Sequence, residues 1–317
     1  MTGVGTPAVV RARHLERDDI AGIIALTHAA GDADGASPLS EHVMLHLKHG
    51  GDTPATHLLA HVGAELVGYA HIDPTDIVQG PSAELCVHPL YRRRGLGRAL
   101  VLQALAVAAE ADPAGRLRLW AHGDHPSANA LALSLGFERS RVLWQMRRSL
   151  LTPIPEPALP PGVELREFRP GEDDQAWLDV NNRAFAEHPD QGGWSLDDLH
   201  VRLREDWFDP AGFLLAFHEG RLVGFHWTKI HGQTTEHGHH HAPIGEVYVL
   251  GVDPSAHGHG LGAALTLAGL HSLRARGLDQ VMLYADESNH GAIRLYQHLG
   301  FARWSTDVCF RSGGTAR

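Results

Sequence analysis

Hydrophobic and polar positions along the chain predict strands and helices in the same order in each half. In the second half, the period-2 and β-rich patterns of strands cover residues 163–168, 213–217, 222–229, 246–252, 280–285 and 301–310. The helical period covers residues 173–185, 260–276 and 290–298. The first half repeats this order with a hairpin near 58–72, a strand at 84–87 and a helix from residue 95. A mixed α/β fold is therefore expected.

Two short motifs recur at nearly one spacing. The pattern R-x-x-G-x-G ends at Gly97, and H-x-x-G-x-G ends at Gly262, 165 residues later. The triplet Leu-Gly-Phe ends at Phe137 and again at Phe301, 164 residues apart. Two matches at almost the same offset indicate that the chain is a tandem repeat of one domain.

A proline-rich segment separates the copies. Residues 152–162 contain five prolines, which remove backbone donors and fix φ. The segment is predicted to be a semi-rigid linker between an N-terminal domain at 1–154 and a C-terminal domain at 155–317.

Composition narrows the class of protein. The 317 residues are 43% hydrophobic and 20% charged, which suits a globular protein with two cores. A formal net charge of −10 argues against a nucleic-acid binder, and no apolar run is long enough to span a membrane. The N-terminus lacks a secretory signal, and two cysteines make no disulfide framework. We expect a cytoplasmic monomer with a small-molecule substrate.

The turn between strand and helix carries the first candidate chemistry. Glycines let the backbone approach an anion, and the following helix offers unpaired N–H groups with partial positive charge. The loops ending at Gly97 and Gly262 both stand between a predicted strand and a predicted helix, so they are predicted to cradle phosphate groups. Neither is followed by the Lys-Ser/Thr of a nucleotide-triphosphate loop, and the third glycine of a dinucleotide fingerprint is missing.

These motifs resemble the GCN5-related N-acetyltransferase (GNAT) superfamily. Arg92-x-x-Gly95-x-Gly97 is similar to its Gln/Arg-x-x-Gly-x-Gly/Ala loop, and the segment from Asn289 to Phe301 is similar to its second signature. Within the superfamily, further segments resemble the mycothiol synthases, a family of tandem acetyltransferases: WAHG at 120–123, QMRR at 145–148, IPEP at 154–157, HPDQGGW at 188–194, FHWTK at 225–229 and GEVYVLGVDP at 245–254. The implied fold is two tandem GNAT domains, each a mixed, mostly antiparallel sheet flanked by helices.

The resemblance implies that acetyl-CoA donates the acetyl group and that the second domain is the catalyst. Aligned on Leu-Gly-Phe, Tyr296 falls opposite Ala132, and a phenol can protonate the departing thiolate whereas alanine cannot. Glu246 is implied as general base. Strand alternation predicts that Glu246 and Leu250 face the same way. Backbone N–H groups near 250–252 are expected to hold the oxyanion.

Contacts with acetyl-CoA carry over from the resemblance to both domains. In the first they are Leu85, Cys86, Val87, Arg93, Arg94, Gly95, Leu96, Gly97 and Arg98. In the second they are Leu250, Gly251, Val252, His257, Gly258, His259, Gly260, Leu261, Gly262, Ala263, Asn289, His290, Gly291, Ala292, Ile293 and Arg294.

The implied acceptor is the α-amine of a cysteine joined to glucosaminyl-inositol, in the last step of mycothiol biosynthesis. Residues that match acceptor contacts are Glu41, Asp190, Lys229, Glu246 and Tyr284. Two alternatives stay open: acetylation of another amine, such as a protein N-terminus or an aminoglycoside, and a CoA-responsive binding protein without turnover.

Two histidine features depart from the family pattern. His257 stands where Gln or Arg opens the second loop, so we expect CoA binding there to tighten as pH falls from about 8 to about 6. The run His237-Gly238-His239-His240-His241 suggests a metal, but no cysteine is close in sequence. We interpret it as a polar loop and expect no metal cofactor.

Overall fold

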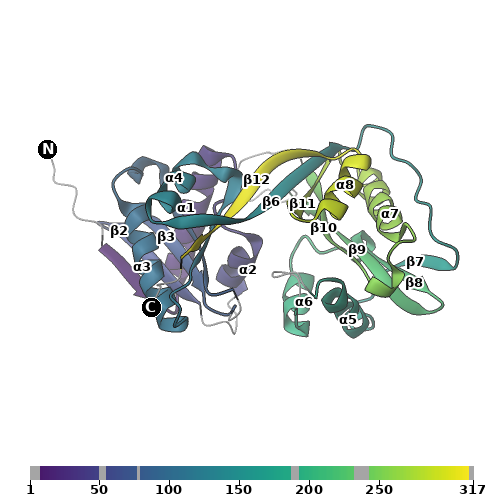
Figure 1. The fold of residues 1–317 in the computed structure, drawn as a ribbon, viewed down its shortest axis with the longest axis horizontal. Helices are drawn as coiled ribbons and strands as arrows, with labels where there is room; N and C mark the ends of the chain where they lie inside the picture. Colours follow the sequence, from purple (N-terminus) through teal and green to yellow (C-terminus); the bar gives the residue numbers. More distant parts are fainter. Residues whose placement is uncertain (1–7, 50–54, 77–78, 187–192, 232–242, 314–317) are drawn as a thin grey trace. The chain divides into compact units, whose positions relative to one another are not determined.

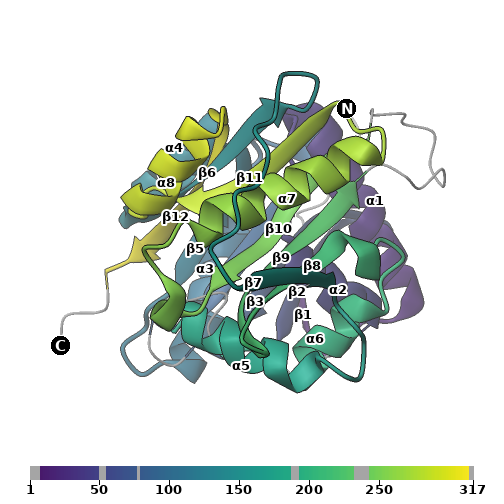
Figure 2. The same ribbon diagram turned by 90° about the vertical axis from the view of Figure 1, so that its right-hand side faces the viewer.

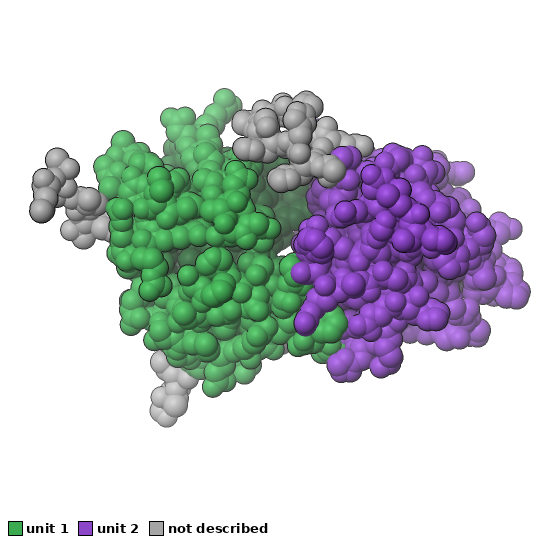
Figure 3. All heavy atoms as spheres, turned by 90° about the horizontal axis from the view of Figure 1, so that it is seen from above, with its two compact units in different colours: residues 1–144, 286–288, 305–317 green, residues 145–285, 289–304 purple. Residues whose placement is uncertain are grey.

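The computed structural model describes residues 8–49, 55–76, 79–186, 193–231 and 243–313. They form two compact units, coloured separately in Figure 3. Unit 1 comprises residues 1–144, 286–288 and 305–317, and unit 2 comprises 145–285 and 289–304. The units therefore differ from the predicted halves 1–154 and 155–317, because residues 145–154 belong to unit 2, whereas residues 286–288 and 305–317 belong to unit 1.

Unit 1 is a sheet with helices on both faces (Figure 1). Its own strands are β1 (Ala8–Ala12), β2 (Thr56–Val62), β3 (Glu65–Asp73), β4 (Ser82–Val87) and β5 (Arg118–Ala121). Its helices are α1 (Arg17–Asp34), α2 (Glu41–His49), α3 (Leu96–Ala111) and α4 (Pro126–Ser134). Strands β1 to β4 pair antiparallel, and β4 pairs parallel with β5.

Unit 2 repeats this plan. Its strands are β7 (Val163–Glu167), β8 (Phe213–His218), β9 (Arg221–His231), β10 (Ile244–Val252) and β11 (Gln280–Asp286). Its helices are α5 (Asp174–Ala184), α6 (Leu196–Leu203), α7 (Leu261–Ala275) and α8 (His290–His298). Strands β7 to β10 are antiparallel, and β10 pairs parallel with β11. The predicted mixed, mostly antiparallel sheets are confirmed, as are the nine elements expected in the second half.

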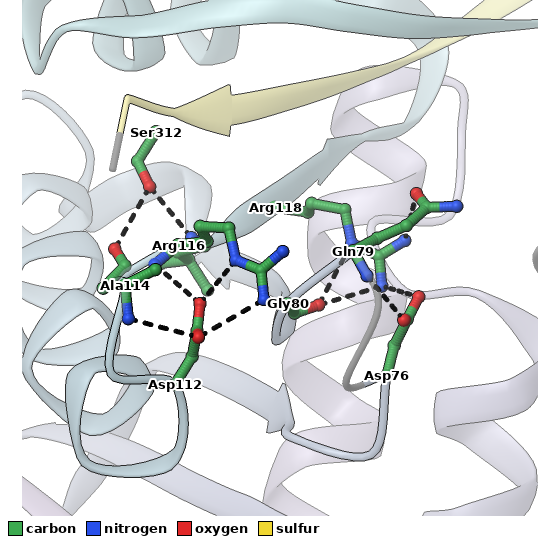
Figure 4. A network of polar contacts seen from close by, with 10 residues as sticks. Asp76, Gln79, Gly80, Asp112, Ala114, Arg116, Arg118 and Ser312 are labelled. Atoms are coloured by element: carbon green, nitrogen blue, oxygen red, sulfur yellow. Dashed lines mark hydrogen bonds and ion pairs between the residues drawn. The ribbon is translucent and has the colours of Figure 1, made fainter. Parts of the chain in front are cut away.

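Two long strands change units along their length. Strand β6 (Phe137–Ser149) begins in unit 1 and continues into unit 2, and β12 (Ala302–Ser312) does the reverse. In unit 1, β12 pairs antiparallel with β5 from Val308 to Arg311. Ser312 then secures its end, because its Oγ accepts the Leu117 N–H at 2.8 Å, in the polar network of Figure 4.

The helices cover opposite faces of each sheet because their apolar residues recur at helical spacing. In unit 1, α3 packs Leu100 and Ala104 against one face, whereas α1 packs Ile23 and Leu26 against the other. In unit 2, α7 covers one face of β8–β10, and α5 and α6 cover the other (Figure 2). The core between the sheet and helices α5 and α6 is strongly aromatic and is centred on Trp227, which is fully buried.

The proline-rich segment does not separate the two units. It connects β6 to β7, and the residues on both sides of it belong to unit 2. His271 of α7 donates a hydrogen bond to the Pro155 carbonyl at 3.0 Å, and Ile154 is buried. The predicted linker is thus part of the surface of unit 2, and the chain passes between units inside β6 instead.

Along the stretches that the structure describes, no helix combines the length and apolarity needed to cross a bilayer.

Candidate active site

Both glycine loops have the same construction. Each follows a strand of the central sheet, passes through a short 3-10 turn and enters a helix at a glycine with positive φ. Gly95 has φ 84° and Gly260 has φ 79°, and a side chain added at either would meet no atom within 4 Å. Glycine is therefore required by the backbone rather than by space. Helix geometry leaves the first N–H groups of α3 and α7 without partners inside their own helices, which is the arrangement that the predicted phosphate binding needs.

The first loop residue supports the turn in both units. Arg92 donates from Nε to the Val87 carbonyl at 3.0 Å and binds Asp34 through both amino groups, at 2.6 and 2.8 Å. His257 donates from Nε2 to the Val252 carbonyl, also at 3.0 Å. The histidine thus keeps the hydrogen bond that fixes the loop to its strand.

Unit 1 contains a cavity of about 410 Å³ beside its glycine loop. Eight of the nine predicted CoA contacts in this domain line it: Leu85, Cys86, Val87, Arg93, Gly95, Leu96, Gly97 and Arg98. Arg94 is not among the lining residues, and its guanidinium lies over the Tyr91 ring at 5.2 Å. Trp120, His122 and Ala132 complete part of the wall. Sequence repeats alone did not indicate Trp120 or His122 as cavity residues.

The two units differ where a proton donor is expected. Tyr296 lies on α8, is 8% exposed and packs edge-on against Phe301 at 5.8 Å. Burial raises the pKa of Tyr296 to about 12, so the phenol stays protonated at neutral pH. Ala132 of α4 lines the cavity of unit 1 and offers no such group. At the start of α8, the Asn289 side chain accepts the Ala292 N–H at 3.1 Å and so caps the helix.

The sequence-based orientation of Glu246 and Leu250 is wrong. The pairing of β10 with β9 runs from Glu246–Lys229 to Val247–Thr228 and then shifts to Val249–Trp227. Tyr248 is the extra residue of a β-bulge, and it reverses the alternation of side chains beyond it. Leu250 consequently packs against the core cluster that contains Leu261 and Leu265 of α7. Glu246 lies on the opposite face, which α5 and α6 cover.

Three predicted acceptor residues meet on that face of unit 2. Lys229 and Glu246 are direct cross-strand partners. Tyr284 lies two residues beyond Met282, which pairs with Glu246, so strand alternation puts it on the same face. The Lys229 ammonium lies 4.4 Å from the Trp207 ring centroid and 5.4 Å from that of Tyr248. The Tyr284 hydroxyl accepts a hydrogen bond from Gln145 at 2.7 Å.

Models of two acetyltransferase groups match the chain, one in each repeat. The Acetyltransferase (GNAT) domain matches residues 53–139, and the Acetyltransferase (GNAT) family matches residues 176–301. The mycothiol acetyltransferase of Acidothermus cellulolyticus is 56% identical over 303 residues, which are 93% of this chain and 91% of the relative. That of Salinispora arenicola is 56% identical over 306 residues, or 96% of each chain.

The chain belongs to the mycothiol acetyltransferase family.

Solved structures support the tandem fold of this family member. A tandem GNAT protein from the clavulanic acid biosynthesis pathway has a TM-score of 0.73 at 21% identity and covers 98% of this chain and 100% of its own. A GCN5-related N-acetyltransferase from Sphaerobacter thermophilus has a TM-score of 0.70 at 26% identity, covering 96% and 95%. The prediction of two GNAT domains is confirmed.

Unit 1 of this family member contains a buried charge cluster that the sequence did not suggest. His122 Nδ1 lies 3.0 Å from Asp307 of β12, and its Nε2 lies 3.5 Å from Glu84. Glu84 also accepts the Ser40 N–H at 2.5 Å. Burial opposes protonation of His122, but the hydrogen bond to Asp307 and the nearby charge of Glu84 outweigh it and raise its pKa to about 10. Burial opposes ionisation of Glu84, but His122 and Ser40 outweigh it, so the Glu84 pKa is lowered. Because Asp307 lies on β12, in the other repeat of the sequence from Glu84 and His122, no contiguous motif could have indicated the cluster.

The other predicted acceptor and metal residues belong to unit 1 or lie outside the described residues. Glu41 opens α2 in unit 1. Asp190 and the run 237–241 lie outside the described residues. Within the described ranges, no three His, Cys, Asp or Glu side chains are grouped as a metal ion would require.

His231 contacts Glu246 but is not among the residues that the sequence predicted for the site. Its Nε2 lies 2.6 Å from Oε2 of Glu246. The alternation Lys229-x-His231 on one strand was the available signal, because it places both side chains on the face of Glu246.

Proposed function

We propose that the chain transfers the acetyl group of acetyl-CoA to the cysteinyl α-amine of cysteinyl-glucosaminyl-inositol, and that unit 2 carries out the reaction. The observation that carries the proposal is the 56% identity to mycothiol acetyltransferases over more than nine-tenths of the chain, through both repeats. Acetyl-CoA is the donor that GNAT enzymes use, and the two glycine loops suit its pyrophosphate.

In the proposed reaction, Glu246 removes a proton from the incoming ammonium. The free amine attacks the thioester carbonyl carbon, and N–H groups of β10 near 250–252 stabilise the oxyanion. The carbon–sulfur bond then breaks, and Tyr296 protonates the leaving thiolate. The raised pKa of Tyr296 supports this role, because the group must hold its proton until sulfur departs.

The acceptor would lie on the face that α5 and α6 cover. A polyol needs hydrogen-bond donors and acceptors, and Lys229 and Tyr284 supply both beside Glu246. The carboxylate also favours the positive charge of the amine before it reacts. Glu41 and Asp190 stay predicted acceptor contacts.

Unit 1 is proposed to bind CoA without turnover. Its cavity brings together most of the predicted contacts, but Ala132 stands where unit 2 has Tyr296.

We also propose that the protein works as a cytoplasmic monomer. Its two cysteines, Cys86 and Cys309, are buried free thiols, which suits a reducing compartment.

A thiol-release assay tests the function. Acetyl-CoA is supplied with cysteinyl-glucosaminyl-inositol, an aminoglycoside or a peptide with a free N-terminus. We expect kcat/KM for the cysteinyl compound to exceed the others by at least about 100-fold, since specific polar contacts discriminate by that order. Glu246→Gln should lower turnover by about 100-fold.

Two results would contradict the proposal. Faster release with the aminoglycoside or the peptide would make the protein an acetyltransferase for another amine. CoA binding without release for any amine would make it a binding protein.

A further inference from the structure

Among the described residues, His231 holds one oxygen of the Glu246 carboxylate. Its Oε2 lies 2.6 Å from Nε2 of His231, and the Glu246 side chain is only 10% exposed. His231 ends β9 and pairs in register with Ile244, two residues before Glu246. The contact is thus a diagonal cross-strand pair, which fixes both side chains on a rigid sheet.

We propose that His231 is a positioning residue for Glu246: its Nε2–H holds Oε2, so that Oε1 points to the acceptor amine and receives its proton. This inference rests on the proposed function. In the step concerned, the ammonium proton moves to Oε1, and the nitrogen lone pair forms the bond to the carbonyl carbon. The carbon–sulfur bond breaks, and sulfur takes the Tyr296 proton. His231 neither gains nor loses a proton.

The neighbouring polar groups are occupied in other ways. The Lys229 ammonium lies over the rings of Trp207 and Tyr248. Arg202 of α6 donates to the Tyr248 hydroxyl at 2.8 Å and to the Asp198 carbonyl at 2.8 Å. The Tyr284 hydroxyl accepts from Gln145. His231 is therefore the group whose described contact fixes the orientation of Glu246.

A second histidine–carboxylate pair in the same unit has a similar distance and similar side-chain exposures, but it takes no part in the proposed reaction. His200 of α6 lies 2.7 Å from Asp174 of α5, with side-chain exposures of 42% and 13%. The corresponding exposures of His231 and Glu246 are 34% and 10%. Substituting His200 therefore breaks an equivalent histidine–carboxylate contact and measures what such a loss costs the fold alone.

A double-mutant cycle separates positioning from general stabilisation. His231→Phe should lower kcat by about 10- to 100-fold while the KM for acetyl-CoA changes little, because a misdirected base slows the chemical step. His231→Gln should recover kcat to within about threefold of wild type, since its amide N–H can replace Nε2–H. Adding His231→Phe to Glu246→Gln should cost less than about twofold more, because residues that act as a unit are not additive. His200→Phe should change kcat by less than about twofold in either background.

The proposal is overturned if His231→Phe keeps the wild-type kcat. It is also overturned if the fold-reduction of kcat by His231→Phe is the same with and without Glu246→Gln, or if His231→Gln is as slow as His231→Phe. CoA binding and the unfolding midpoint are measured for each variant, and His231→Ala replaces the Phe variant if that one does not fold. The cycle uses whichever amine the wild-type protein acetylates fastest. Failure of the proposed acceptor would therefore show in the wild type, whereas failure of this inference shows only in the cycle.

Discussion

The two units share one backbone plan but differ in their side chains. Gly95 and Gly260 enter their helices with almost the same φ, and Arg92 and His257 support their loops by the same bond. The architecture that suits CoA is therefore duplicated. The units differ at the positions proposed to carry the chemistry: Tyr296 stands opposite Ala132, and β10 has a bulge at Tyr248 that the pairing of β3 with β4 lacks.

A glutamate in each unit illustrates the difference. Glu84 receives the Ser40 N–H and faces a histidine that is held cationic, and its pKa is lowered, so it is a poor proton acceptor at neutral pH. Glu246 lies at a bulge, beside a lysine and a partly exposed histidine, on the side of the sheet away from α7. The first arrangement forms part of a buried charge cluster, and the second is the one that we propose leaves an oxygen for a substrate.

The largest effect is expected from Tyr296→Phe, which makes unit 2 resemble unit 1 at this position. Loss of the proton donor should lower kcat by about 100- to 1000-fold, with CoA affinity unchanged, because general acid catalysis contributes on that order. Thiol release measures the first quantity and calorimetric titration with CoA measures the second.

The wild type provides a pH control for the same group. With the Tyr296 pKa raised to about 12, the donor stays protonated as pH rises, so kcat should show no alkaline fall between about pH 7 and about 10. If Tyr296→Phe turns over at the wild-type rate, the phenol is not the acid and the asymmetry between the units loses its chemical meaning.

A smaller effect, on stability, is expected from the buried cluster of unit 1. His122→Gln leaves Glu84 and Asp307 without their cation and should destabilise unit 1 by about 3 kcal/mol. The raised pKa of His122 stabilises the fold fully below about pH 6.5, the unfolded value, and this contribution is lost as pH rises through about 10. The unfolding midpoint of the wild type should therefore fall between about pH 6.5 and 10, and that of the variant should fall less.

His42→Gln is the matched control for this change. His42 lies 3.7 Å from Asp73, and its side chain is 53% exposed, so its loss should cost under about 0.5 kcal/mol. Equal costs for the two substitutions would show that the cluster gives unit 1 no special stability.

The sequence predicted local elements well because each depends on its own residues. Strands β8 to β10 and helix α7 follow from periodicity, and the glycine loops from φ values that only glycine adopts readily. The passage of β6 and β12 from one unit into the other was not predictable, because strand pairing between distant segments leaves no local pattern. The bulge at Tyr248 was missed for a related reason: one extra residue changes no composition but turns every later side chain to the other face.

The smallest effect compares the two loops directly. Gly95→Ala and Gly260→Ala both place a Cβ in open space at positive φ, so each costs only backbone strain of about 1 kcal/mol. Because unit 2 is the proposed catalyst, Gly260→Ala should raise the KM for acetyl-CoA about three- to fivefold, whereas Gly95→Ala should weaken CoA binding to unit 1 and alter turnover less than about twofold. Steady-state kinetics and CoA titration of both variants measure these quantities. An equal rise in KM for the two variants would mean that the loop of unit 1 contributes to the reaction, and the division of labour between the units would have to be abandoned.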